Sequence, residues 1–191
     1  MKYTPRQYAI KIFWIVVNPI RHAYWFIVRP KTLGVKCLVE NEEAFLLVRI
    51  NYGHRRWTVP GGGIHKGEAP EVAAMRELKE EAGIVADKVR KIGEYTNTHQ
   101  YKIDTVHVYH TRVPNRDSSI DGFEIAEAEW FTLAQLPKDR MPSVDRILTM
   151  RQETELRRAT LIASTGVSTR LAGSKLSDKE VEQISKFSEQ R

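Results

Sequence analysis

The chain has little of two things, cysteine and long hydrophobic runs. Its single cysteine among 191 residues, Cys37, excludes an intramolecular disulfide, and its place in an apolar stretch favours an inert buried thiol in a reducing cytoplasm. Within residues 8–28 the longest apolar run covers only 12–17, which is too short for a membrane-spanning helix. No convincing secretory cleavage site follows it, and no internal repeat is evident. The sequence therefore predicts a cytoplasmic globular protein.

Composition indicates a class of protein but not a function. A hydrophobic share of 41% and a charged share of 28% are those of a soluble globular protein. The net charge of +6 attracts polyanions such as nucleotides, and it would also suit nucleic acid or an anionic membrane. We expect one domain at 31–150 and a C-terminal helical or flexible extension at 151–191, in which 163–175 is small and polar enough for a linker.

The first 30 residues form a separate N-terminal arm in this interpretation. Trp14 and Trp25 lie among apolar and basic residues, a pattern that predicts an amphipathic helix or extended arm. We expect this arm to pack on the domain or on the second subunit of a homodimer. Contact with a membrane interface is the competing interpretation.

Between residues 31 and 150 the pattern alternates between strands and helices. Runs of β-branched and aromatic residues predict the strands, and the glutamates at 40–43 fall in a predicted hairpin turn. Proline and glycine bound the predicted helices. The expected strands are 34–39, 44–49, 57–59, 91–95, 103–113 and 123–131, and the expected helices are 70–82, 133–136 and 143–150.

Three glutamates fall on one narrow arc of the first predicted helix. Glu77, Glu80 and Glu81 stand at positions i, i+3 and i+4. Like charges at this spacing destabilise a helix by roughly 0.2–0.5 kcal/mol per pair. Lys79 points away from the arc and Arg76 lies only at its edge, so a divalent cation, Mg²⁺ or Mn²⁺, is the expected counter-ion. A solvated acidic helix face is the alternative.

The residues around this helix favour a site over a solvated face. The Pro-Gly-Gly-Gly segment at 60–63 can bend sharply and bring its main chain close to a ligand. Pro70 suits the first turn of the helix and Gly83 can end it in the left-handed conformation. The whole pattern resembles the Nudix box of the Nudix hydrolases at every defined position, namely Gly62, Glu68, Arg76, Glu77, Leu78, Glu80, Glu81, Gly83 and Ile84. Ala69 stands where many members of that family carry Ser or Thr.

The resemblance implies a fold and an activity for residues 31–150. The implied fold is an α/β/α sandwich around a mixed sheet. The implied reaction is the metal-dependent hydrolysis of a pyrophosphate link in a nucleoside diphosphate joined to another group, so the partner is a small nucleotide and nucleic acid is not required. The implied metal ligands and catalytic groups are Glu77, Glu80 and Glu81, one of which can instead be the general base, with the carbonyl of Gly61 or Gly62, with Glu124 as a further carboxylate, and with Arg76 and Glu68 as a supporting ion pair.

Two other functions stay open at this point. One is a non-catalytic nucleotide-binding module, whose usual sign is erosion of the box glutamates, which are intact here. The other is an isomerase of prenyl diphosphates on the same fold, which would need a catalytic cysteine, and Cys37 is the only cysteine in the sequence. The nucleotide itself is not specified, because ADP-ribose, oxidised nucleoside triphosphates, dinucleoside polyphosphates and nucleotide sugars are distinguished by loops that no local motif fixes.

Overall fold

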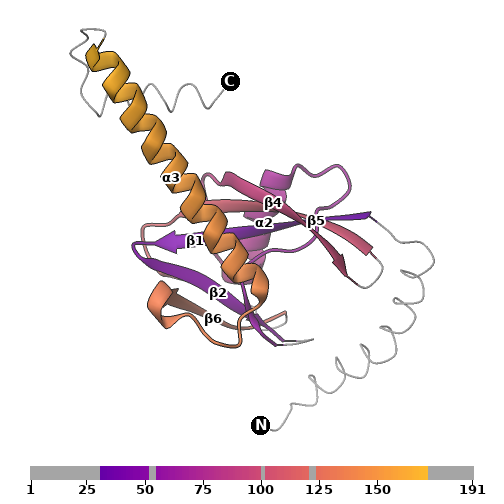
Figure 1. Ribbon diagram of the computed structural model, residues 1–191. Coiled ribbons are helices and arrows are strands. Elements are labelled where there is room, and N and C mark those ends of the chain that lie inside the picture. Colours follow the sequence, from indigo (N-terminus) through magenta and orange to yellow (C-terminus); the bar gives the residue numbers. More distant parts are fainter. Residues whose placement is uncertain (1–30, 52–54, 100–101, 121–123, 172–191) are drawn as a thin grey trace, which may run out of the picture. The chain divides into compact units, whose positions relative to one another are not determined.

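A computed structural model describes residues 31–51, 55–99, 102–120 and 124–171 (Figure 1). The expected N-terminal arm at 1–30 and the terminal segment at 172–191 lie outside these ranges, so the homodimer and membrane interpretations stay predictions. Within the described ranges no helix is both long and apolar enough to cross a membrane.

The described strands form one six-stranded mixed sheet in the order β3-β2-β1-β5-β4, with β6 also paired to β2. Strands β1 and β5 run parallel, and the other neighbouring strands run antiparallel. The predicted mixed sheet is therefore confirmed. The elements are β1 (Lys31–Asn41), β2 (Ala44–Ile50), β3 (Trp57–Thr58), α2 (Pro70–Ala82), β4 (Arg90–His99), β5 (Lys102–Arg112), β6 (Ile125–Thr132), the 3-10 helix η1 (Leu133–Gln135) and α3 (Pro142–Leu171).

The hairpin expected near residues 40–43 is present between β1 and β2. Asn41 pairs with Ala44, which leaves a two-residue turn, and Glu42 adopts a positive φ of 54° in it. Two-residue hairpin turns require such left-handed residues because their twist matches that of the flanking strands. The turn therefore fixes the register of β1, the strand that carries much of the core.

Helix α2 covers one face of the sheet (Figure 1). Val35, Cys37 and Val39 of β1 alternate toward it, and all three are buried. The helix meets them with Leu78 and with small alanines, which let the helix backbone approach the sheet closely. This packing also fixes the adjoining side of α2, where Glu77 and Glu81 lie buried beside the alanines.

The start of α3 packs on the other face. Tyr95 of β4 lies 4.9 Å beneath the guanidinium of Arg146, and Val144 and Ile147 are fully buried. The main-chain N–H of Met141, just before the helix, donates to the Trp57 carbonyl at 2.8 Å. Helical residues thus cover both faces of the sheet, which confirms the α/β/α arrangement.

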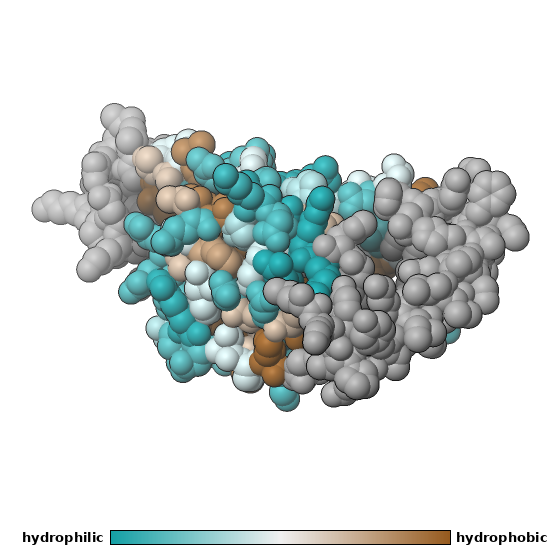
Figure 2. All heavy atoms as spheres, turned by 90° about the horizontal axis from the view of Figure 1, so that it is seen from below, coloured by the Kyte–Doolittle hydropathy of each residue, from teal (hydrophilic) through white to brown (hydrophobic). Residues whose placement is uncertain are grey.

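The first compact unit of the chain ends at Ile147, and a second unit begins at Leu148. Helix α3 nevertheless continues without interruption to Leu171. The expected helix at 143–150 is therefore present and much longer, and the linker expected at 163–175 is wrong for residues 163–171. On the face drawn in Figure 2, hydrophilic residues predominate among the coloured atoms, and the hydrophobic residues form small groups.

The ends of α2 match the sequence prediction. Ala69 is the N-cap residue, with extended φ and ψ of −70° and 140°, and its side chain makes no capping hydrogen bond. Pro70 occupies the first turn, and Gly83 ends the helix in the left-handed conformation at φ 66°. The main-chain N–H of Gly83 satisfies carbonyls of the last turn, but the amides at the N-terminal end lack a side-chain acceptor from residue 69.

We predict that Ala69→Ser stabilises the protein by about 0.5–2 kcal/mol, because a hydroxyl at the N-cap accepts a hydrogen bond from a free amide of the first turn. Thermal unfolding measures the change. Ala159→Ser, which adds the same hydroxyl to an exposed position inside α3, is the control and is expected to give no gain. An equal or lower midpoint for Ala69→Ser would show that other groups already satisfy these amides.

Candidate active site

The glycine segment that precedes α2 lies along the edge of β1. The N–H groups of Cys37 and Val35 donate to the carbonyls of Pro60 and Gly62, each at 2.9 Å. Gly61, between them, has a φ of 141°, and a β-carbon there would overlap the Val35 carbonyl oxygen. Only glycine fits this position, so the segment is held as an added strand of main chain beside the sheet.

Helix α2 presents two buried carboxylates to this segment. The Gly61 N–H donates to Glu81 Oε2 at 2.7 Å. The Glu77 carboxylate lies against Gly62, where an added β-carbon would be only 2.6 Å from Oε1. Glu77 and Glu81 are 8% and 9% exposed, whereas the Glu80 side chain is 59% exposed. The arc of three glutamates therefore runs from the loop to the surface.

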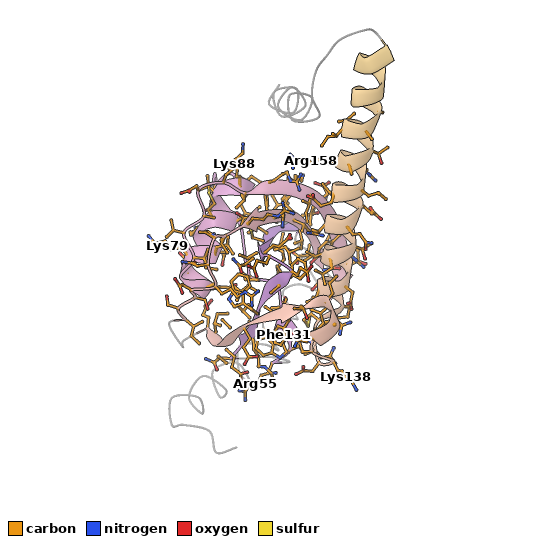
Figure 3. All side chains as sticks on the ribbon, turned by 90° about the vertical axis from the view of Figure 1, so that its left-hand side faces the viewer. Arg55, Lys79, Lys88, Phe131, Lys138 and Arg158 are labelled. Carbon is orange, nitrogen blue, oxygen red and sulfur yellow. The ribbon has the colours of Figure 1, made fainter. Side chains whose placement is uncertain are left out.

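Arg76 contacts more of these carboxylates than its place at the edge of the arc suggested. Its Nε and Nη2 donate to the two oxygens of Glu68 at 2.9 and 3.0 Å, as the expected ion pair requires. Its Nη1 donates to Glu77 at 2.8 Å and to Glu80 at 3.0 Å. The bonds from Arg76, followed by the His65 N–H, lower the pKa of Glu68 to about 2. Lys79 points outward, as predicted (Figure 3).

Lys36 is a second cation at the site, and the sequence analysis missed it. Its Nζ donates to the carbonyls of Val59 and Gly61 at 2.6 and 3.2 Å. Burial lowers the pKa of Lys36, while the nearby carboxylates of Glu81 and Glu77 act in the opposite direction. The available signal was one lysine inside the apolar run 34–39. Arg76 and Lys36 therefore already balance part of the charge for which the sequence analysis expected a divalent cation.

Burial raises the pKa of Glu81. The charged groups that act on this pKa identify the residues near its carboxylate. Lys36 and the Gly61 N–H lower this pKa, whereas Glu77 and Glu124 raise it. Glu124, which comes from the segment before β6, is therefore close enough to Glu81 for its charge to act there, and its part in a metal site stays a prediction. Its main-chain carbonyl accepts a hydrogen bond from the Asn51 N–H at 2.8 Å.

Glu127, the other acidic candidate of that segment, faces a different partner. Its Oε2 lies 3.5 Å from Arg49 Nε, and Arg49 also contacts Asp139 at 3.3 Å. The pairing of β2 with β6 shifts between Arg49 and Ile50. Such an irregularity re-aims the residues that follow it. Glu124 and Glu127 thus have different environments although they are three residues apart.

The donor chemistry of the site fits a hard divalent cation. Glu77, Glu80, Glu81 and the Gly61 carbonyl supply oxygen atoms, which are the ligands that Mg²⁺ or Mn²⁺ prefers. Yet among the residues that the structure describes, no three acidic, histidine or cysteine side chains are grouped around a common point. Arg76 draws Glu77 and Glu80 toward itself. Cation binding would therefore require side-chain rotations.

A cleft of about 820 Å³ begins at the glycine segment and extends over the start of β1. This volume is within the usual range for small-molecule sites. Lys31, His65 and Lys66 are exposed at its rim, which favours an anionic ligand. On its wall, Thr32 Oγ1 donates to Asp104 Oδ1 at 2.6 Å. The lining residues are 31–36, 61–68, Asp104 and Val106.

Cys37 takes no part in this cleft. It is fully buried in the core between β1 and α2 and is not among the residues that line the cleft. Burial also raises its pKa above the ordinary value of a thiol. It is therefore an inert core residue, as the sequence analysis predicted.

A mixed sheet covered by helices, with a glycine segment placed against a glutamate-bearing helix, is the arrangement that the resemblance to the Nudix box implies. The family model described as the NUDIX domain matches residues 30–152, and the chain belongs to this family. The protein is a NUDIX-type pyrophosphohydrolase.

Related proteins agree with this assignment. A Bacillus subtilis (strain 168) protein named "Putative 8-oxo-dGTP diphosphatase" is 31% identical over 115 residues, which are 60% of this chain and 76% of that protein. An RNA pyrophosphohydrolase of Acinetobacter baylyi is 36% identical over 70 residues, 37% of this chain and 42% of its own length. The fold is similar to that of a MutT NUDIX hydrolase from Burkholderia pseudomallei, with a TM-score of 0.59 and 19% identity over 63% of this chain and 98% of that one.

We predict that Gly62→Ala lowers the free energy of unfolding by about 0.5–1.5 kcal/mol, because the added methyl group pushes the flexible Glu77 carboxylate out of its hydrogen bond with Arg76. Gly63→Ala is the matched control, since nothing lies within 4 Å of a β-carbon there, and it should change stability by less than about 0.5 kcal/mol. Urea denaturation of both variants gives the comparison. Equal effects of the two substitutions would contradict the close contact between Gly62 and Glu77.

Proposed function

We propose that the protein is a divalent-metal-dependent hydrolase that cleaves the pyrophosphate link within a nucleoside diphosphate joined to another group. The observation that carries this proposal is the buried Glu81 carboxylate, which is held by the Gly61 N–H and shares its surroundings with Glu77 and Glu124. A cation bound there supplies charge that neutralises phosphate oxygens and activates water. Mg²⁺ is the expected cation and Mn²⁺ the alternative.

The carboxylates have different parts in this proposal. Glu81 and Glu80 hold the cation, and Glu77 either holds it too or accepts the proton of the attacking water. Between the two glycine carbonyls we favour Gly61 as a ligand, because the Gly62 carbonyl accepts the shorter main-chain bond from the Val35 N–H at 2.9 Å, whereas the Gly61 carbonyl accepts the longer bond from Lys36 Nζ at 3.2 Å. The pair of Arg76 and Glu68 fixes the start of the helix relative to the loop and orients Glu77.

The cleft accommodates the rest of the substrate. Its exposed basic rim suits the phosphates, and its wall offers both apolar surface and the Thr32–Asp104 pair to the nucleoside. The relatives named for 8-oxo-dGTP and for RNA support a nucleotide, and they make an oxidised nucleoside triphosphate and an RNA 5′ end the first compounds to test. ADP-ribose, dinucleoside polyphosphates and nucleotide sugars complete the set.

The two other functions have less support. The isomerase interpretation depends on a reactive cysteine in the cleft, and Cys37 is buried in the core instead. A non-catalytic binding module would bind nucleotide without turnover. We therefore propose an assay of all these compounds with Mg²⁺ or Mn²⁺, followed by analysis of the phosphate and nucleotide products. Cation-dependent cleavage of at least one compound supports the hydrolase, and tight binding with no cleavage would favour the module.

We predict that Glu81→Gln lowers turnover by more than about 100-fold, because it removes a charged cation ligand and keeps the shape of the side chain. Without metal the variant should be no more stable than the wild type, because the repulsion from Glu77 is relieved but the buried Lys36 ammonium loses its strongest counter-charge. Steady-state kinetics and thermal unfolding in EDTA test both statements. Wild-type turnover in Glu81→Gln and also in Glu80→Gln would exclude these residues as cation ligands.

We also predict that Glu124→Gln lowers turnover by about tenfold or more and weakens cation activation, because its charge acts at Glu81. Glu127→Gln is the matched control, and its effect should stay within about threefold because it removes only a partly exposed contact with Arg49. Titration of both variants with Mg²⁺ under turnover measures the difference. The reverse order of damage would assign the extra carboxylate to Glu127.

A further inference from the structure

Three consecutive residues of β1 bind four consecutive carbonyls of the segment that leads into the site, those of residues 59–62. The main-chain N–H of Cys37 donates to the Pro60 carbonyl and that of Val35 donates to the Gly62 carbonyl, each at 2.9 Å. Lys36 Nζ donates to the other two carbonyls, that of Val59 at 2.6 Å and that of Gly61 at 3.2 Å. Main-chain pairing reaches only alternate carbonyls, so the other two depend on the lysine.

Lys36 is linked to the buried carboxylate through Gly61. The Gly61 carbonyl accepts from Lys36 Nζ, and the Gly61 N–H donates to Glu81 Oε2 at 2.7 Å. The ammonium group is also the cation that acts most directly on Glu81. The Lys36 side chain thus holds the carbonyls of Val59 and Gly61, which lie on either side of the Gly61 N–H that binds Glu81. It also balances the charge of Glu81.

The two cations of the site have separate partners. Arg76 binds Glu68, Glu77 and Glu80 at the helix and the loop that precedes it. Lys36 acts from the sheet, with Glu81 as its strongest charged neighbour, followed by Glu77 and Asp104. Arg76 therefore cannot replace Lys36 at Glu81.

We propose that Lys36 is a positioning residue of the hydrolytic site, which holds the Gly61 peptide groups and Glu81 in place before cation and substrate bind. The kinetic part of this inference rests on the proposed function. The structural part does not, because the contacts exist in the chain without any ligand.

Hydrogen exchange of the full-length protein tests the structural part, measured by mass spectrometry on a peptide that spans 59–64. In Lys36→Met, which keeps the aliphatic stem and removes the donors, we expect exchange in this peptide to be at least about tenfold faster, with peptides of α2 and β5 unchanged. Lys79→Met removes a lysine charge from the outer surface of α2 and is the control, with wild-type exchange throughout (Figure 3). Unchanged exchange at 59–64 in Lys36→Met would overturn the proposal.

Kinetics separate positioning from direct substrate binding. A positioning residue predicts a fall of about 10- to 100-fold in kcat, with KM within about threefold of wild type. A rise in KM at constant kcat would show that Lys36 binds the substrate itself, and would also overturn the proposal. Absence of turnover in the wild-type protein contradicts the proposed function, whereas the exchange experiment still decides the role of Lys36.

A second pair of variants covers the case in which Lys36→Met does not fold. Lys36→Arg keeps the charge and the donors, and its exchange at 59–64 should stay within about threefold of wild type. Lys36→Gln keeps an N–H donor and loses the charge, so its exchange should be at least about tenfold faster. Equal exchange in these two variants would show that the charge of Lys36 is not needed, which contradicts the proposed role.

Discussion

The guanidinium of Arg76 joins the helix of the site to the loop that precedes it. It donates to both oxygens of Glu68, to Glu77, to Glu80 and to the Gly63 carbonyl, all within 2.8–3.0 Å. Charge-assisted bonds from a planar donor fix direction as well as distance. The loop and the carboxylates therefore keep one arrangement, and the rest of the site depends on it. Removal of this one group would leave three carboxylates close together without their shared partner.

The sheet supports the same arrangement from the other side. Strand β1 binds the glycine segment through its main chain, and α2 packs its alanines and Leu78 on the buried residues of that strand. Glu77 and Glu81 consequently face a main chain that carries no side chains at Gly61 and Gly62. Lys36 places a positive charge beside Glu81. The protein thus holds acidic groups at high density because two cations flank them and glycine leaves them room.

Much of this could be predicted from the sequence, because its signals are local. The spacing of Glu77, Glu80 and Glu81 places them on one helix face, and Pro70 and Gly83 mark the ends of that helix. The role of Lys36 could not be predicted in this way, since it depends on the pairing of β1 with a segment more than 20 residues away. The sequence leaves the segment beyond residue 150 as either helical or flexible, and the small and polar residues near 163–171 do not predict that α3 continues through them. The reach of Arg76 to three carboxylates depends on rotamers that spacing alone does not specify.

The central claim is that the glycine segment and the glutamates of α2 form one cation site. Anomalous X-ray scattering from crystals grown with Mn²⁺ tests it most directly, because the signal locates the ion independently of activity. The account predicts a peak bound by Glu81 and the Gly61 carbonyl at oxygen distances of about 2.0–2.3 Å, with Glu80 or Glu77 rotated away from Arg76 to complete the ligand set. A peak bound by other residues, or no peak at saturating Mn²⁺, would contradict it.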